Sequence, residues 1–203
     1  MNNYTSEQAM NALNDHDAEV RARAIEQLGE LGHAPAVPHL LTILEASDPG
    51  TRFITVQALG RIADAAAVPA LLTHLRGDDP WVRAAATGSL IAIGTPAVDG
   101  LIEGLRDEDK AVRRAAAKAL GKIGAAEEAA INGLSVALLD VDKGVRRFAA
   151  EALGRLGEER MVPELAEALD DGDPRTRIAA FRALAQIDTP EAREAVRQWA
   201  KDQ

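Results

Sequence analysis

The stretch DKAVRRAAAKALGKIG, residues 109–124, contains the features that decide the fold of this chain. It opens with Asp109, a residue type that caps helix N-termini well. Apolar residues then recur at helical spacing from Val112 to Leu120. Gly124 follows, and glycine readily adopts the left-handed conformation that ends a helix. The stretch therefore predicts one amphipathic helix with a defined start and a defined end.

Six copies of this stretch occur along the chain, and their first residues are separated by 31, 31, 30, 33 and 31 positions. The aspartates that open the copies are Asp17, Asp48, Asp79, Asp109, Asp142 and Asp173. An arginine stands four residues after each of them: Arg21, Arg52, Arg83, Arg113, Arg146 and Arg177. A leucine column also recurs: Leu28, Leu59, Leu90, Leu120, Leu153 and Leu184. Such a fixed period indicates an array in which each unit packs on its neighbours.

A second helix is expected in each unit, between one Asp-led copy and the next. The segments that predict it are residues 36–44, 67–75, 96–105, 127–139 and 161–169. Single capping helices are expected at about residues 6–14 and 190–201. We therefore predict one all-α domain over residues 1–203, with roughly 13 helices. Short loops between antiparallel neighbours would wind about six helical hairpins into a right-handed α-solenoid, or α-α superhelix.

The pattern D-P-x-V-R-x-x-A-A-x-A-L-G-x-I-G, followed by A-V-P-x-L-x-x-x-L, resembles the short HEAT-like repeat of the phycobilisome-lyase type. The resemblance covers about residues 12–190. It implies HEAT-like hairpins whose Asp-led helices line a concave face. It also implies that the arginine column forms a ladder with neighbouring aspartates along the stack. The ankyrin and tetratricopeptide signatures are missing from the sequence.

The non-repeating positions of the Asp-led helices are the expected partner-binding surface, because the repeated positions serve packing. The residues expected to contact a partner are Phe53, Ile54, Gln57, Trp81, Arg114, Lys118, Arg147, Phe148 and Arg182. Three of the six aromatic residues are among them, and aromatic residues near arginine are frequent interface hot spots. The alternative is that these rings fold into the gaps between repeats. Phe181 occupies an apolar column instead, and we expect it to pack in the core.

The net charge of −9 hides an uneven distribution of charge. The last three Asp-led copies contain 12 of the 23 lysines and arginines, but only four acidic residues. This predicts a basic patch in the C-terminal half of the concave face, which favours a protein partner with an acidic surface. A solvated face whose charges only keep the array soluble is the alternative.

Side chains for catalysis or metal binding are not found in any recognisable pattern. The chain has no cysteine, which excludes disulfides and thiolate metal sites. Its four histidines form no metal-binding motif, and neither a phosphate-binding loop nor a nucleophile elbow occurs. We therefore expect no catalytic residue, no metal and no cofactor. The predicted function is a non-catalytic protein-binding scaffold.

Two other functions stay open. The family resemblance implies an accessory subunit of a bilin lyase or isomerase-type system, and the basic patch allows nucleic-acid binding, which the net charge disfavours. No secretory signal or membrane-spanning stretch is recognisable, so we expect a cytoplasmic protein without a membrane partner. Gly88 and Ile91 interrupt the third copy, and such variation favours a natural sequence over a consensus design.

Overall fold

The structure is a computed structural model that describes residues 4–46 and 48–201. Within those residues it contains thirteen α-helices, five short 3-10 helices and no strand. The chain divides into two compact units, Met1–Gly100 and Leu101–Gln203, and each is described by itself. The all-helical repeat fold expected from the sequence is confirmed. That residues 1–203 act as a single domain stays a prediction.

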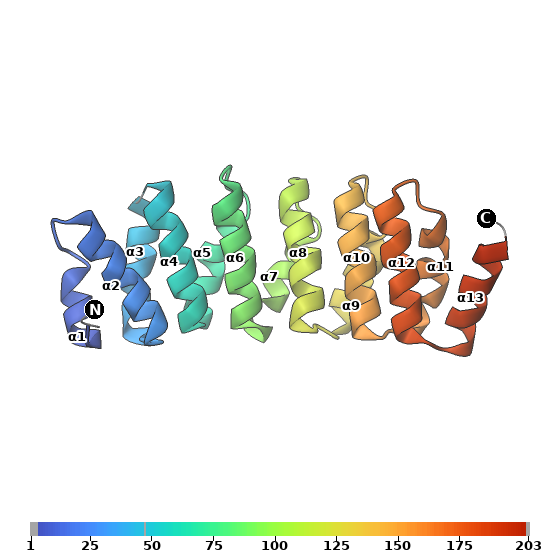
Figure 1. Cartoon of the computed structure of the whole chain (residues 1–203), viewed down its shortest axis with the longest axis horizontal. Coiled ribbons are helices and arrows are strands. Elements are labelled where there is room, and N and C mark those ends of the chain that lie inside the picture. Colours follow the sequence, from blue (N-terminus) through green and yellow to red (C-terminus); the bar gives the residue numbers. More distant parts are fainter. Residues whose placement is uncertain (1–3, 47, 202–203) are drawn as a thin grey trace. The chain divides into compact units, whose positions relative to one another are not determined.

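The first unit is built on three Asp-led helices, α2 (Ala18–Glu30), α4 (Pro49–Ile62) and α6 (Pro80–Ile93). These helices lie side by side in one layer, with α3 (Val37–Ala46) and α5 (Val68–Thr73) behind them (Figure 1). Helix α1 (Ser6–Ala12) packs on α2. The boundary between the units falls within α7 (Val98–Gly104).

The second unit repeats the arrangement with α8 (Lys110–Ile123), α10 (Lys143–Leu156) and α12 (Pro174–Ile187). Behind these three helices lie α9 (Glu128–Ala137) and α11 (Val162–Glu167) (Figure 1). The last helix, α13 (Pro190–Lys201), packs against α11 and α12. Helices thus occur near both positions where capping helices were predicted, and their role as caps of the array stays a prediction.

The ends of the Asp-led helices follow the sequence prediction. Each of the six opening aspartates accepts a hydrogen bond from a backbone N–H two residues later, as Asp109 does from Ala111 at 2.8 Å. A positive φ angle at Gly124 ends α8 as predicted, and Gly32, Gly94 and Gly157 have positive φ angles at the same position of their copies. At the corresponding positions of the second and sixth copies, Ala63 and Asp188 have φ angles of 57° and 52°. Those two helices therefore end in a conformation that disfavours a side chain.

Successive Asp-led helices approach closely because glycine faces a small residue across their interface. A Cβ atom built on Gly154 would lie 2.5 Å from the Cα of Ala183, and one built on Gly29 would lie 2.8 Å from the Cα of Ala58. The leucine column is fully buried beside these contacts, as Leu153 illustrates at 0% exposure. Glycine is therefore required here for packing, despite its unfavourable entropy within a helix.

The prediction that Phe181 packs in the core is wrong. Its side chain is 41% exposed, and its ring centroid lies 6.4 Å from that of Trp199 on α13. Residues at the same position of earlier copies, such as Val56 and Ala150, are fully buried. The copy that contains Phe181 is followed by α13, and Phe181 contacts this helix through the ring of Trp199.

The outer helices differ from one another at their starts. Four of them are preceded by a 3-10 turn, at Ala34–Ala36, Ala65–Ala67, Thr95–Ala97 and Glu159–Met161. Helix α9 begins directly at Glu128, because two additional residues lie between Gly124 and Ile131. This insertion accounts for the single 33-residue spacing between copies.

Candidate partner-binding surfaces

The arginine column forms an ion-pair ladder in the second unit. Arg113 binds the carboxylate of Asp140 in a bidentate manner, with Nε–Oδ2 and Nη2–Oδ1 distances of 2.6 and 2.9 Å. Arg146 binds Asp171 with the same two distances. The side chains of both pairs are at most 19% exposed. The ladder implied by the family resemblance is therefore present within this unit.

The aspartates of the ladder are not the helix caps but the residues two positions before them. The same carboxylate also orders the loop, because Asp171 Oδ1 accepts a hydrogen bond from the backbone N–H of Asp173 at 2.7 Å. Arg146 Nη1 in turn donates to the carbonyl of Asp140 at 2.8 Å. The hydrogen bond from Arg146 lowers the pKa of the Asp171 carboxyl. Within this unit, Arg113 and Arg146 thus have structural partners, which favours a packing role over a catalytic one.

None of the nine residues predicted to contact a partner is buried. Trp81 is the most exposed of the three aromatic residues, with 73% of its surface accessible. Phe53 and Phe148 are half-buried, so each ring packs in part against its surroundings. Lys118 and Arg182 are exposed, while Ile54 is half-buried. The predicted register of the exposed helix face is therefore the one observed.

A shallow hollow of about 710 Å³ lies on the exposed face of α4 and α6 in the first unit. Phe53, Gln57 and Trp81 line it together, whereas Ile54 does not. Its floor is made of small residues on α6, including Ala85 and Gly88. Apart from its own turn of helix, nothing lies within 4 Å of the position that a Cβ of Gly88 would occupy. The hollow therefore offers open, mostly apolar space beside an exposed indole.

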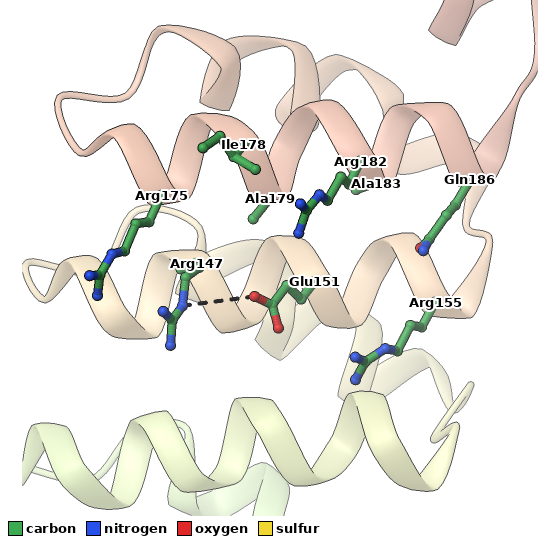
Figure 2. A pocket seen from close by; sticks show the side chains of 9 residues that line it. All are labelled: Arg147, Glu151, Arg155, Arg175, Ile178, Ala179, Arg182, Ala183 and Gln186. Atoms are coloured by element: carbon green, nitrogen blue, oxygen red, sulfur yellow. Dashed lines mark ion pairs between the residues drawn. The ribbon is translucent and has the colours of Figure 1, made fainter.

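A second hollow, of about 440 Å³, lies between α10 and α12 in the second unit. Figure 2 shows its lining, to which each helix contributes two arginines: Arg147 and Arg155 from α10, and Arg175 and Arg182 from α12. Glu151 is the one acidic residue among the side chains that line it. Ile178 adds an apolar side chain that is 51% exposed. The hollow is therefore strongly basic, with a local apolar surface.

Three of these four arginines are unpaired. Arg155, Arg175 and Arg182 form no side-chain hydrogen bond or ion pair with any other residue that the structure describes. Arg147 differs, because its Nε lies 3.8 Å from Glu151 Oε1 and its guanidinium carbon lies 4.3 Å from the centre of the Phe148 ring. The free guanidinium groups can therefore bind an external anion without breaking an internal pair.

Arg114 lies on the same helix face but is already bound. Its guanidinium pairs with the carboxylate of Asp142, which also caps α10 through the N–H of Gly144 at 2.9 Å. The hydrogen bond from Arg114 lowers the pKa of Asp142 to about 2. Arg114 and Phe148 line a smaller hollow of about 210 Å³. Arg114 therefore links two copies, in addition to being half-exposed on the predicted surface.

The residues singled out from the sequence as partner contacts include Arg147 and Arg182 of the basic hollow but not Arg155, Arg175 and Ile178, which were assigned only to the exposed helix face. All three occupy non-repeating positions of Asp-led helices, so the pattern placed them on the surface. Their grouping depends on how α10 and α12 are offset, which the pattern of a single helix does not contain. A comparison of facing positions in consecutive copies would have supplied the missing signal.

The family model for HEAT repeats matches residues 6–91, 68–140 and 131–203. The chain therefore belongs to the HEAT repeat family, as the repeat pattern predicted. No curated protein matches it significantly. Within the described ranges, no helix is long and apolar enough to cross a membrane. No group of three or more His, Asp or Glu side chains is arranged to hold a metal ion in the same residues.

Several solved structures are similar to this chain. One comes from work on microtubule plus end tracking by XMAP215, CLIP-170 and EB1, with 18% identity, a TM-score of 0.64, and coverage of 89% of this chain and 91% of that chain. Another is a designed armadillo repeat protein in complex with the peptide (KR)4, with 17% identity, a TM-score of 0.57 and coverage of 91% and 100%. Both show an armadillo- or HEAT-like fold. The complex of CpcE and CpcF of phycocyanin lyase from Nostoc sp. PCC7120 has 24% identity, a TM-score of 0.47 and coverage of 97% and 81%.

Proposed function

We propose that this chain is a non-catalytic scaffold that binds another protein through the exposed face of its Asp-led helices. An acidic segment of that partner occupies the hollow between α10 and α12. The observation that carries this proposal is the group of three unpaired arginines, Arg155, Arg175 and Arg182, around the exposed side chain of Ile178.

The chemistry of the hollow fits carboxylates. A guanidinium group presents a planar fork of N–H donors that matches a carboxylate in a bidentate manner. Ile178 adds an exposed apolar side chain to the lining of the same site, and covering it with an aliphatic side chain of the partner adds affinity. An acidic peptide that also carries aliphatic residues therefore uses both features of the site. Electrostatic attraction would speed its encounter with the second unit.

The first unit contributes a different anchor. Trp81 stands beside a floor of small side chains, and an exposed indole offers a large apolar surface with one hydrogen-bond donor. We propose that this hollow takes an apolar side chain of the same partner. Two separate anchors of different chemistry would raise the selectivity of the scaffold, because a partner must satisfy both.

Binding of a labelled peptide of alternating glutamate and leucine, followed by fluorescence anisotropy, tests the basic hollow. We expect the combined variant R155Q/R175Q/R182Q to weaken binding by about tenfold or more, since charged contacts are lost. The control variant R193Q/R197Q/K201Q removes three cationic residues on α13, outside the hollow, and should bind nearly as the parent does. Equal affinity of the parent and the first variant would exclude this site.

Nucleic-acid binding is the second candidate, because the same arginines could contact phosphates. A labelled single-stranded oligonucleotide distinguishes the two functions, since counterion release makes its binding fall steeply with salt. We expect the acidic peptide to bind more tightly than the oligonucleotide at moderate ionic strength, because the peptide also uses Ile178. Tighter binding of the oligonucleotide, lost in R155Q/R175Q/R182Q, would replace the protein partner with a nucleic acid.

A further inference from the structure

Apolar side chains are concentrated on the outer layer of the second unit, on the opposite helix set from the basic hollow. Val136 on α9 is 73% exposed, Leu139 is 80% exposed and Val141 is 93% exposed. All three lie within six consecutive residues at the end of α9 and in the loop before α10. Large apolar side chains exposed together in this way are unusual on a surface that has only solvent to face.

The other copies show that the repeat does not require these residues. The positions lie six, three and one residues before the opening aspartate of the next copy. In the remaining copies the same positions are polar or glycine: Thr42, Glu45 and Ser47; Thr73, Arg76 and Asp78; Glu103, Arg106 and Glu108; Glu167, Asp170 and Gly172. The fold forms with polar residues there, so a packing requirement does not explain the apolar set in this copy.

Carboxylates surround this apolar surface. Val136 and Leu139 line a hollow of about 470 Å³ together with Glu164, Glu167 and Asp170. These three acidic side chains form no hydrogen bond or ion pair with another residue in the described part of the chain, and Glu164 Oε2 is buried without a hydrogen-bond partner. The other two aspartates of the hollow are already neutralised by arginines of the ladder. The charge of the hollow that no internal ion pair balances is therefore negative.

We propose that this outer surface, defined by Val136, Leu139, Val141, Glu164, Glu167 and Asp170, docks a segment of another protein that carries both aliphatic and basic side chains. The aliphatic side chains of that segment cover Val136 and Leu139, and its lysines or arginines pair with the three free carboxylates. Charge complementarity selects this occupant, since an acidic segment would meet repulsion at the same site.

This surface is independent of the proposed function, because its residues lie on α9, on α11 and in the segments that follow these two helices, and none of them lines the hollow between α10 and α12. Its required partner also has the opposite charge from the partner of the basic hollow. A single chain would thus bring a basic segment and an acidic segment to opposite faces of one unit. Each site is tested by its own variants, so the failure of one leaves the other unaffected.

The test uses the full chain and a fluorescein-labelled peptide of alternating leucine and lysine, read by fluorescence anisotropy. The first variant, V136T/L139E/V141S, introduces the residues that the first copy has at these positions. It adds a negative charge, so weaker binding of a cationic peptide can only come from the lost apolar contact. We expect its affinity to fall about tenfold. The control L31E changes another exposed leucine, in the first unit, and should leave binding unchanged.

The second variant, E164Q/E167Q/D170N, removes the three carboxylates and keeps the apolar surface. We expect weaker binding and a smaller dependence of affinity on salt, because fewer ion pairs form. A serine–lysine peptide should bind weakly, since it lacks the aliphatic side chains, and a leucine–glutamate peptide should not bind the outer surface. Unchanged affinity in both variants would overturn the proposal.

Self-association is the remaining way to cover the apolar surface. Analytical ultracentrifugation of the parent and of V136T/L139E/V141S measures it directly. We expect both to sediment as monomers over the concentrations of the binding assay. Parent oligomers that dissociate in the variant would show that a second copy covers this surface, and would overturn the proposed partner. Circular dichroism of both variants verifies that the helices are retained.

Discussion

Consecutive copies are joined differently in the two units. In the second unit, Arg113 and Arg146 each bind an aspartate in the loop before the next copy. In the first unit, the sequence has alanine and glycine at the corresponding loop positions, 46 and 77, so the ladder carboxylate is missing there. Both units nevertheless keep the close approach of glycine to a small residue. Close packing is therefore common to both units, and the ion pairs of the ladder are an addition in the second unit.

The exposed faces of the Asp-led helices differ even more. The first unit presents Trp81 above alanine and glycine, whereas the second presents unpaired arginines around Ile178. These residues occupy equivalent positions of the same repeat. The comparison shows that positions outside the interfaces between copies can change their chemistry without changing the fold, which lets one array carry several binding surfaces.

The largest expected effect comes from breaking the packing that the two units share. Gly154→Ala places a Cβ atom against the backbone of Ala183, so α10 and α12 must separate. We expect a loss of about 2–3 kcal/mol in the free energy of unfolding, measured by urea denaturation. Gly29→Ala should destabilise the first unit in the same way. The control Gly88→Ala meets nothing within 4 Å apart from its own turn of helix, and should be neutral or slightly stabilising.

A smaller loss of stability should distinguish the second unit, which has the ion-pair ladder, from the first. Asp171→Asn removes the negative charge that Arg146 binds, and leaves a mostly buried guanidinium without its counter-charge. We expect a loss of about 2 kcal/mol in the free energy of unfolding, as for other hydrogen bonds to charged groups. Asp170→Asn makes the same change at the adjacent residue, which is exposed and unpaired among the described residues, and should have little effect. Equal losses in the two variants would show that the ladder contributes nothing specific.

Acid should weaken the second unit more than the first. The hydrogen bonds from Arg114 and Arg146 hold the pKa of Asp142 at about 2 and lower that of Asp171, compared with a usual value of 3.8. Because the folded state binds protons less readily, this stabilisation is complete above pH 4 and is lost as the pH falls toward 2. We expect a loss on the order of 1–2 kcal/mol over that range, reduced by solvent screening of the half-exposed Arg114.

The two tryptophans allow each unit to be followed separately, because Trp81 lies in the first and Trp199 in the second. In W81F, acid unfolding reports on the second unit, and in W199F it reports on the first. We expect the transition seen in W81F to occur at the higher pH. The same transition pH in both variants would contradict the assignment of the acid-sensitive ion pairs to the second unit.

Most of the fold could be predicted because it depends on local signals that repeat. Asp109 and Gly124 mark the two ends of a helix by their own backbone preferences, and six registered copies remove the ambiguity of any one. Phe181 was misplaced because the repeat pattern treats all copies alike, whereas this position is buried at Val56 and Ala150 but exposed at Phe181. The carboxylates of the ladder, such as Asp171, were missed for a similar reason: their partners lie about 25 residues away. The glycines that face a small residue of the next Asp-led helix, such as Gly29 and Gly154, stand at the same position of their copies. The third copy has Ile91 at that position, shortly before the boundary between the units.

The grouping of surface residues was harder to predict than the surface itself. The register of one helix places Arg155 and Arg175 outside the core, but their meeting with Arg182 depends on the offset between α10 and α12. The outer surface around Leu139 could have been found from the sequence, since this position is polar in every other copy. The copies of the repeat can thus be compared with one another. A residue that differs in type from those at the same position of the other copies, and that packing does not require, indicates a binding role.

The smallest expected effect concerns a helix end that differs between copies. Ala63 adopts a φ of 57° where Gly32, Gly124 and Gly157 stand in other copies, and a side chain in that conformation costs about 1–2 kcal/mol. Ala63→Gly removes this cost but makes the unfolded chain more flexible, which offsets part of the gain. We therefore expect the free energy of unfolding to rise by about 0.5–1 kcal/mol, measured by urea denaturation of W199F, in which Trp81 reports on the first unit. Ala84→Gly, in the exposed middle of α6, should instead lower the free energy of unfolding, because glycine is unfavourable inside a helix. If both substitutions destabilise the unit equally, the left-handed conformation of Ala63 is not the source of strain.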